Sequence, residues 1–149
     1  MANSIQQAKI AATPSEKVKT NELAGRVRVA FAEYEASAEQ STIHMFSLPN
    51  GARILSGRLA HDALGSSTTL AVGHNEYIDS SGSTVAADAD EFKAAASSAS
   101  AGAANVANTI ALGENSLVNA DKDGLPVSVT MGGAAGTGTI QLTMMYVVD

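Results

Sequence analysis

The sequence contains no cysteine and no tryptophan among its 149 residues, and aromatic residues make up only 4% of it. The absence of cysteine excludes disulfides, a thiolate nucleophile, and zinc or iron–sulfur sites with cysteine ligands. Because aromatic side chains are so few, the core has to be built from aliphatic residues, each of which buries less area. We therefore expect an isolated copy to be modestly stable and to gain further burial by associating with neighbours.

Long apolar runs and a basic surface are also missing. No stretch approaches the roughly 18 apolar residues that span a membrane, and the first residues lack a signal-peptide core, so we expect a protein made in the cytoplasm with no membrane partner. The formal net charge is −6, which repels phosphate backbones and predicts no nucleic-acid partner. The nearest approach to a basic cluster is Arg26, Arg28, Arg53 and Arg58, which we interpret as a solvated sheet face or as interface salt bridges.

The sequence predicts an extended polar arm, residues 1–24, followed by a domain, residues 25–149. The arm has no sustained hydrophobic period and carries isolated apolar residues at Ile5, Ile10 and Val18. Such a segment cannot bury enough surface to order itself, so either it is mobile or these three residues dock on a neighbour. They are the candidate assembly contacts.

Alternating patterns in the domain predict β-strands. Val27, Val29 and Phe31 point to one side of a half-buried strand, and the intervening residues point to the other. Pro49, Asn50 and Gly51 supply the backbone angles of a tight turn. Further strands are predicted over residues 42–48, 52–61, 68–72, 125–131 and 139–148. The last strand places one set of side chains in the core, namely Ile140, Leu142, Met144, Tyr146 and Val148.

Residues 79–104 differ in composition, being rich in serine, glycine, alanine and aspartate. Alanine favours a helix that Asp88 or Asp90 could cap, whereas the serines and Gly102 oppose it. The stretch from residue 88 to about 101 is therefore either one short helix or an ordered loop. One more short strand is predicted over residues 106–112.

No pattern in the sequence predicts catalysis or a bound cofactor or metal. The glycine-rich residues 132–138 lack the lysine and serine or threonine of a phosphate loop, and a strand rather than a helix follows them. Residues 119–124 begin like a calcium loop but lack the glutamate at the twelfth position. His44, His61 and His74 are separated and have no pattern of convergent ligands. We expect a protein that is not an enzyme.

Several motifs resemble those of small capsid decoration proteins, also called cement proteins, and related virion proteins of tailed bacteriophages. The resemblance covers most of residues 24–149, and its most specific element is the turn and strand Leu-Pro-x-Gly-Ala-x-Ile, beginning at Leu48. The motifs that carry it are Gly-Arg-Val-Arg-Val-Ala from Gly25, Phe-Ser-Leu-Pro-Asn-Gly-Ala-Arg-Ile-Leu-Ser-Gly-Arg-Leu from Phe46, Thr-Thr-Leu-Ala-Val-Gly from Thr68, and Gly-Thr-Ile-Gln-Leu-Thr-Met-Met-Tyr from Gly138.

The resemblance implies an antiparallel, jelly-roll-like β-sandwich, commonly a homotrimer. Such a protein sits on the outside of a phage head and bridges adjacent subunits of the major capsid protein, and an extended terminal arm often reaches a neighbour. The resemblance carries over no catalytic residue. Alternatives from other classes are a head-fibre or tail domain, a carbohydrate-binding or adhesin module, and an enzyme on a jelly-roll scaffold. Carbohydrate-binding surfaces usually present exposed aromatic residues. This chain has only six aromatic residues in all, which argues against the carbohydrate-binding alternative.

Overall fold

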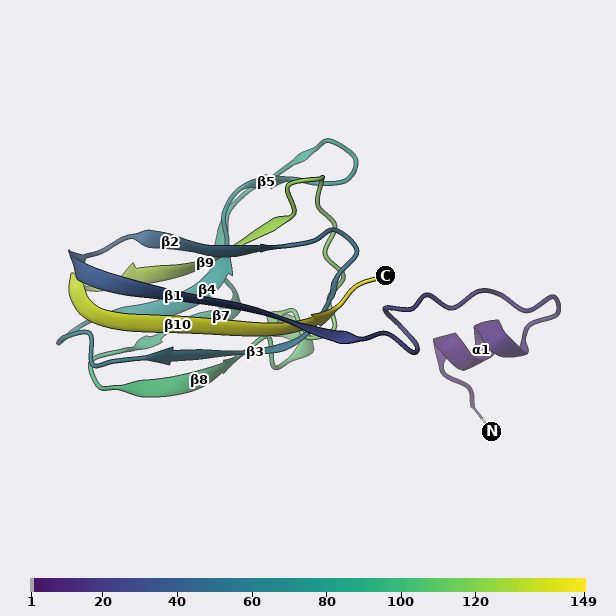
Figure 1. Ribbon diagram of the computed structural model, residues 1–149, viewed down its shortest axis with the longest axis horizontal. Helices are drawn as coiled ribbons and strands as arrows, with labels where there is room; N and C mark the ends of the chain where they lie inside the picture. Colours follow the sequence, from purple (N-terminus) through teal and green to yellow (C-terminus); the bar gives the residue numbers. More distant parts are fainter. Residues whose placement is uncertain (1) are drawn as a thin grey trace.

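A computed structural model describes residues 2–149, apart from the side chain of Glu39, and shows a β-sandwich with an N-terminal projection (Figure 1). The projection holds one helix, α1 (Ile5–Ala11), and a single 3-10 turn, η1 (Ile110–Leu112), follows the eighth strand. The strands are β1 (Val27–Glu39), β2 (Thr42–Leu48), β3 (Arg53–His61), β4 (Thr69–His74), β5 (Tyr77–Ile78), β6 (Thr84–Val85), β7 (Asp88–Ser97), β8 (Gly102–Val106), β9 (Leu125–Gly132) and β10 (Gly136–Val147).

Eight of these strands form two antiparallel sheets. Sheet A has the order β1-β10-β3-β8, sheet B has the order β2-β9-β4-β7, and β5 and β6 form a separate small hairpin. The chain crosses from one sheet to the other at most of its connections, and this double Greek key is the topology of a jelly roll. The prediction of a mainly β, antiparallel sandwich is confirmed.

The core lies between the two sheets and is almost entirely aliphatic. The alternation predicted for the last strand holds from Ile140 to Tyr146, since Ile140, Leu142 and Met144 of β10 are fully buried and Tyr146 packs against the same cluster. It fails at Val147, which the alternation places on the opposite face but which is buried after a register shift between Met145 and Tyr146. The turn at residues 49–51 is confirmed as well, because Ala52 N donates to Pro49 O at 3.1 Å and Gly51 has a φ of +80°. The largest fully buried side chains are Leu48, Ile54, Leu59, Leu64, Leu70, Val72, Val106, Val127, Met131, Ile140, Leu142 and Met144.

The alanine- and serine-rich stretch is neither a helix nor a loop, so both predictions for residues 88–101 are wrong. It forms β7, which pairs with β4 at the edge of sheet B, and the chain then turns into β8 at the edge of sheet A. Phe92 is buried and anchors β7 on the core, while the small side chains around it stay exposed. Pairing with β4 and the burial of Phe92 outweigh the helix propensity of alanine, which is a weak preference.

Two other elements differ from prediction. The predicted strand over residues 106–112 is wrong, because β8 ends at Val106 and η1 follows. The short helix of the structure lies in the arm instead, so the prediction that the arm is extended is wrong over Ile5–Ala11. Ser4 Oγ caps this helix by accepting from Gln7 N at 3.2 Å. No helix within residues 2–149 has the length and the apolar character to cross a membrane.

Gly73 marks the closest approach between two strands of sheet B. A Cβ added at Gly73 would lie 1.9 Å from Asp88 O, because β4 and β7 come together at a register shift there. We predict that Gly73→Ala lowers the free energy of unfolding by about 1–3 kcal/mol, the usual cost of overpacking. Urea denaturation followed by circular dichroism measures this.

Gly102→Ala is the matched control, since the nearest atom to its Cβ would be His61 Cε1 at 3.8 Å. The control should change the free energy of unfolding by less than about 0.5 kcal/mol. Equal effects from the two substitutions would show that the approach of β7 to Gly73 imposes no packing constraint.

Candidate assembly surfaces

The N-terminal arm, residues 2–24, extends beyond one end of the sandwich, and α1 stands apart from both sheets (Figure 1). Glu22 connects α1 to the base of the arm. Gln6 Nε2 donates a hydrogen bond to Glu22 Oε1 at 3.2 Å, and Lys9 Nζ lies 3.8 Å from Glu22 Oε2. The helix is therefore held to the arm's own base rather than to the sandwich.

The base of the arm is fixed to the sandwich by polar contacts. Asn21 is buried, its Nδ2 donates to Gly51 O at 2.9 Å, and its own carbonyl oxygen accepts from Arg53 Nε at 3.1 Å. Thr20 N donates to the side chain of Asp149 at 3.0 Å. Because the base cannot swing freely, these contacts direct the rest of the arm away from the sheets.

The candidate contact residues of the arm lie in different surroundings. Ile5 is 73% exposed, Ile10 is 44% exposed and Val18 is half-buried. Leu23, which sequence reasoning did not single out, is 55% exposed at the arm's base. That these residues touch a neighbour stays a prediction, and Ile5 and Ile10 have the apolar surface for such a contact.

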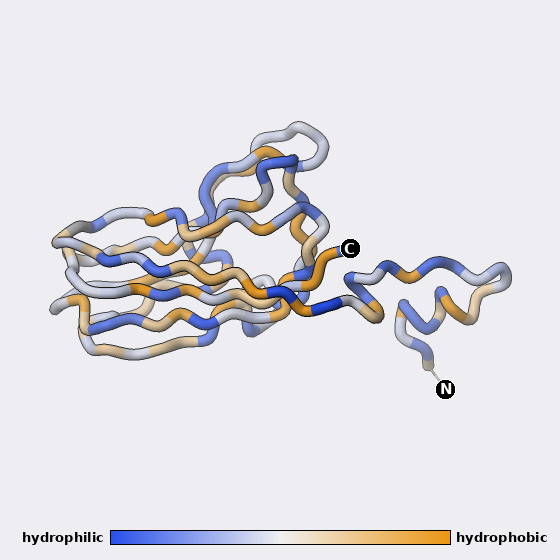
Figure 2. The backbone as a smooth tube through the Cα atoms, in the orientation of Figure 1, coloured by the Kyte–Doolittle hydropathy of each residue, from blue (hydrophilic) through white to orange (hydrophobic). Residues whose placement is uncertain are grey.

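The second surface is an apolar patch on the outward face of sheet A, which we call the outer strip. It consists of Val27, Val29 and Phe31 of β1, which are 58%, 60% and 59% exposed, and Met145 of β10, which is 40% exposed. Val29 and Met145 are directly opposite each other in the register, so the patch is continuous across the two strands. Hydrophobic and hydrophilic residues follow one another along these strands (Figure 2).

The alternation predicted for β1 is present, and the structure shows which side of it is buried. Ala30 and Ala36 face the core, while the larger side chains of Val29 and Phe31 face outward. Tyr34 also points inward from β1 and packs against the same core cluster. The sequence pattern could not identify this surface, because both alternating sets contain apolar residues.

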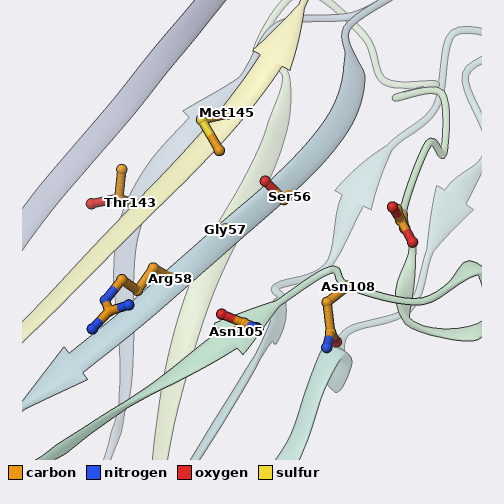
Figure 3. A pocket seen from close by; sticks show the side chains of 8 residues that line it. Ser56, Gly57, Arg58, Asn105, Asn108, Thr143 and Met145 are labelled. Carbon is orange, nitrogen blue, oxygen red and sulfur yellow. The ribbon is translucent and has the colours of Figure 1, made fainter.

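A depression of about 510 Å³ lies beside the outer strip (Figure 3). Its lining comes from β10, β3, β8 and the loops after β8, and Met145 belongs to both the depression and the strip. Its volume is within the range of cavities that hold small ligands or inserted side chains. The lining residues are Ser56, Gly57, Arg58, Asn105, Asn108, Glu114, Thr143 and Met145.

Charged side chains flank the outer strip on the same face. Glu33 accepts a hydrogen bond from Gln141 Nε2 at 2.6 Å, and Glu35 accepts one from Thr139 Oγ1 at 2.7 Å. Arg58 lies on the other side of β10, opposite Thr143 in the register, and its side chain has no ion-pair or hydrogen-bond partner among residues 2–149. The face thus carries an acidic flank, an apolar strip and an unpaired cation.

The structure does not bring together the residues that the sequence analysis considered as candidate metal, calcium or phosphate sites. The Nδ1 atoms of His61 and His74 lie 2.8 Å and 3.0 Å from the backbone oxygens of Asp62 and Asn75, and His44 is on another strand. Asp121 Oδ1 accepts from Asp123 N in a local turn within the calcium-like segment. The glycine-rich residues 132–138 include the end of β9, the connecting turn and the start of β10. Within residues 2–149, no group of three or more metal-ligating side chains gathers.

Neither a protein-family model nor a curated protein matches the chain. Chains of similar fold occur in solved phage capsids. A chain in the capsid asymmetric unit of cyanophage Pam1 is 21% identical with a TM-score of 0.60, covering 84% of this chain and 86% of that one. A chain in the capsid of Ralstonia phage GP4 is 19% identical with a TM-score of 0.61 and the same coverage. A chain in the acid-stable capsid of Helicobacter pylori bacteriophage KHP30 is 14% identical with a TM-score of 0.55, covering 82% and 87%. These similarities show a shared fold.

The charge of Glu22 should hold the arm in place. The hydrogen bond from Gln6, together with the backbone N–H of Lys19 and the nearby Lys9 and Arg53, lowers the pKa of Glu22 below its usual value. We predict that Glu22→Gln leaves the sandwich folded but exposes the arm, so that trypsin cleaves after Lys9 and Lys17 several-fold faster at neutral pH. A time course analysed by mass spectrometry measures this.

The same contact predicts a pH dependence with a definite sign. Because the folded pKa of Glu22 is lowered, its stabilising effect is complete above the unfolded pKa and is lost as the pH falls through the lowered value. Pepsin should therefore cleave the wild-type arm faster as the pH falls, without a matching step in Glu22→Gln. Glu16→Gln, at an exposed position in the arm, is the control and should behave as wild type. Identical cleavage of all three proteins would contradict the anchoring role.

Proposed function

We propose that this chain is a structural virion protein of a tailed bacteriophage, and specifically a capsid decoration protein. It would bind the outside of the head, bridge adjacent subunits of the major capsid protein and stabilise the shell. The single observation that carries the proposal is the shared jelly-roll fold with chains of three phage capsid structures, over 82–84% of this chain.

The shape and charge of the molecule support this role. A net charge of −6 repels packaged DNA, so the protein is better suited to the outer surface of a shell than to its interior. A protein clamped across subunit joints adds burial that exists only in the assembled state. Because a shell carries many copies, a modest contact per copy is sufficient.

We assign the contact with the major capsid protein to the arm. The arm projects from one end of the sandwich, and Ile5 and Ile10 are exposed with no apolar surface of the sandwich to cover them. Val18, half-buried in the linker after α1, would become fully buried in the same contact. The arm carries three lysines and two glutamates, whereas the rest of the chain is strongly acidic, so the arm is the part least repelled by acidic neighbours.

Sedimentation with empty shells tests the proposal. The shells are assembled from the major capsid protein encoded in the same viral genome and mixed with increasing amounts of this protein. We expect co-sedimentation that saturates at a fixed ratio to capsid subunits, and cryo-electron microscopy of the pellet should show extra density on the outer surface. Protein that remains in the supernatant at every concentration, or that is found only in tails or fibres of the virion, would contradict the decoration role.

Arm variants locate the contact. We predict that Ile5→Ser with Ile10→Ser raises the apparent dissociation constant for shells by about tenfold or more, because apolar anchors dominate such contacts. Deletion of residues 2–18 should abolish binding while the thermal unfolding of the sandwich stays unchanged.

Ile78→Ser is the control, since Ile78 is an exposed apolar residue on the β5–β6 hairpin, away from the arm. Normal binding by the arm deletion would move the capsid contact from the arm to a sheet face. A deletion variant that fails to fold would show that the arm is part of the domain's own structure.

A further inference from the structure

The outer strip exposes the larger apolar side chains of β1. Val27, Val29 and Phe31 are each more than half exposed, although Ala30 of the same strand packs against the core. Phe31 is one of only three phenylalanines in the chain. Because more than half of this side chain is exposed to water, covering the face with another surface is favourable.

The same face also offers a complementary surface. The depression beside the strip can receive a projecting side chain, and Met145 makes the two surfaces continuous. Arg58, at its rim, has no ion-pair or hydrogen-bond partner within the part of the chain that the structure describes. Glu33, on the strip's own strand, is held in place by Gln141. One face therefore provides an exposed apolar strip, a hollow, and a Glu33–Arg58 pair of opposite charges.

We propose that the outer strip of one copy packs into the depression of a second copy of this chain, with Glu33 of the first copy facing Arg58 of the second. Each copy offers one strip and one depression, so every copy in a closed assembly makes both contacts. The paired charges would fix the register, while burial of Phe31 and Val29 supplies the attraction. This contact is separate from the arm, and it does not rest on the proposed capsid role.

One pair of opposite charges at this face favours a second copy as the partner. Glu33 beside the strip and Arg58 in the lining of the depression can pair between two copies without a further protein. Glu114 also lines the depression, so the complementarity rests on the Glu33–Arg58 pair. A nucleic acid would be repelled by the net charge of −6. The interpretation of Arg58 as one half of an interface salt bridge agrees with its position at the rim of the depression.

Light scattering after size exclusion, on the full chain without shells, tests the proposal. We expect the wild-type mass to be a multiple of 15.1 kDa. Phe31→Thr, which keeps a residue suited to a strand, should raise the dissociation constant by about tenfold or more. Ile78→Thr is the matched control on the β5–β6 hairpin and should leave the wild-type mass unchanged.

Charge reversal tests the register. Glu33→Arg and Arg58→Glu should each weaken association, and the double variant should restore it because the pair re-forms with its charges exchanged. Lys122→Glu is the control for the charge change, since its cation pairs only locally with Asp123. Circular dichroism confirms that each variant is folded.

Two outcomes would overturn the proposal. One is a wild-type protein that stays monomeric at high concentration, and the other is a double charge variant that associates no better than the single variants. Failure to bind shells would count against the decoration role alone, because these experiments contain no capsid protein.

Discussion

The alternation of side chains along β1 determines how sheet A meets its surroundings. Ala30, Tyr34 and Ala36 pack toward the core from this strand. Since successive side chains point to opposite faces of a sheet, Val29 and Phe31 lie on the other face, where they are exposed. The apolar face of sheet A follows from this alternation.

The core and the exposed face of sheet A differ in where they place the aromatic side chains. The largest fully buried side chains are leucine, isoleucine, valine and methionine, and Phe92 is the one phenylalanine among the buried residues that the structure describes. Of the phenylalanines, Phe92 anchors an edge strand and Phe31 lies outside. We therefore expect the exposed apolar surface to be buried on assembly, which would stabilise the molecule further.

Periodicity predicted much of the fold, and its failures have physical reasons. The inward face of β10 and the turn at Gly51 could be predicted because alternation and turn chemistry act locally. The strand at residues 88–97 could not, because the alanines favour a helix and only pairing with β4 makes this stretch extended. The arm's Ile5 and Ile10 were recognisable as unpaired apolar residues. The outer strip was not, because a valine and phenylalanine pattern is also typical of a buried face.

The arm and the outer strip are two separate candidate contact surfaces. The arm's base is fixed by Asn21, Glu22 and Arg53, so its helix projects from one end of the sandwich, while the strip lies on the face of sheet A. Separate surfaces allow contact with other copies and contact with a shell at the same time. If both surfaces bind at once, two modest contacts together would hold the protein more tightly than either contact alone.

The most direct measurement is the solvent accessibility of the outer strip, using a single thiol at Val29→Cys in a chain that has no native cysteine. The rate of modification by a thiol reagent is followed over a wide range of protein concentrations, with Ile78→Cys as the reference. The account predicts that the thiol at position 29 becomes protected as concentration rises, while the thiol at position 78 reacts at a constant rate. Equal and constant rates at both positions would contradict it.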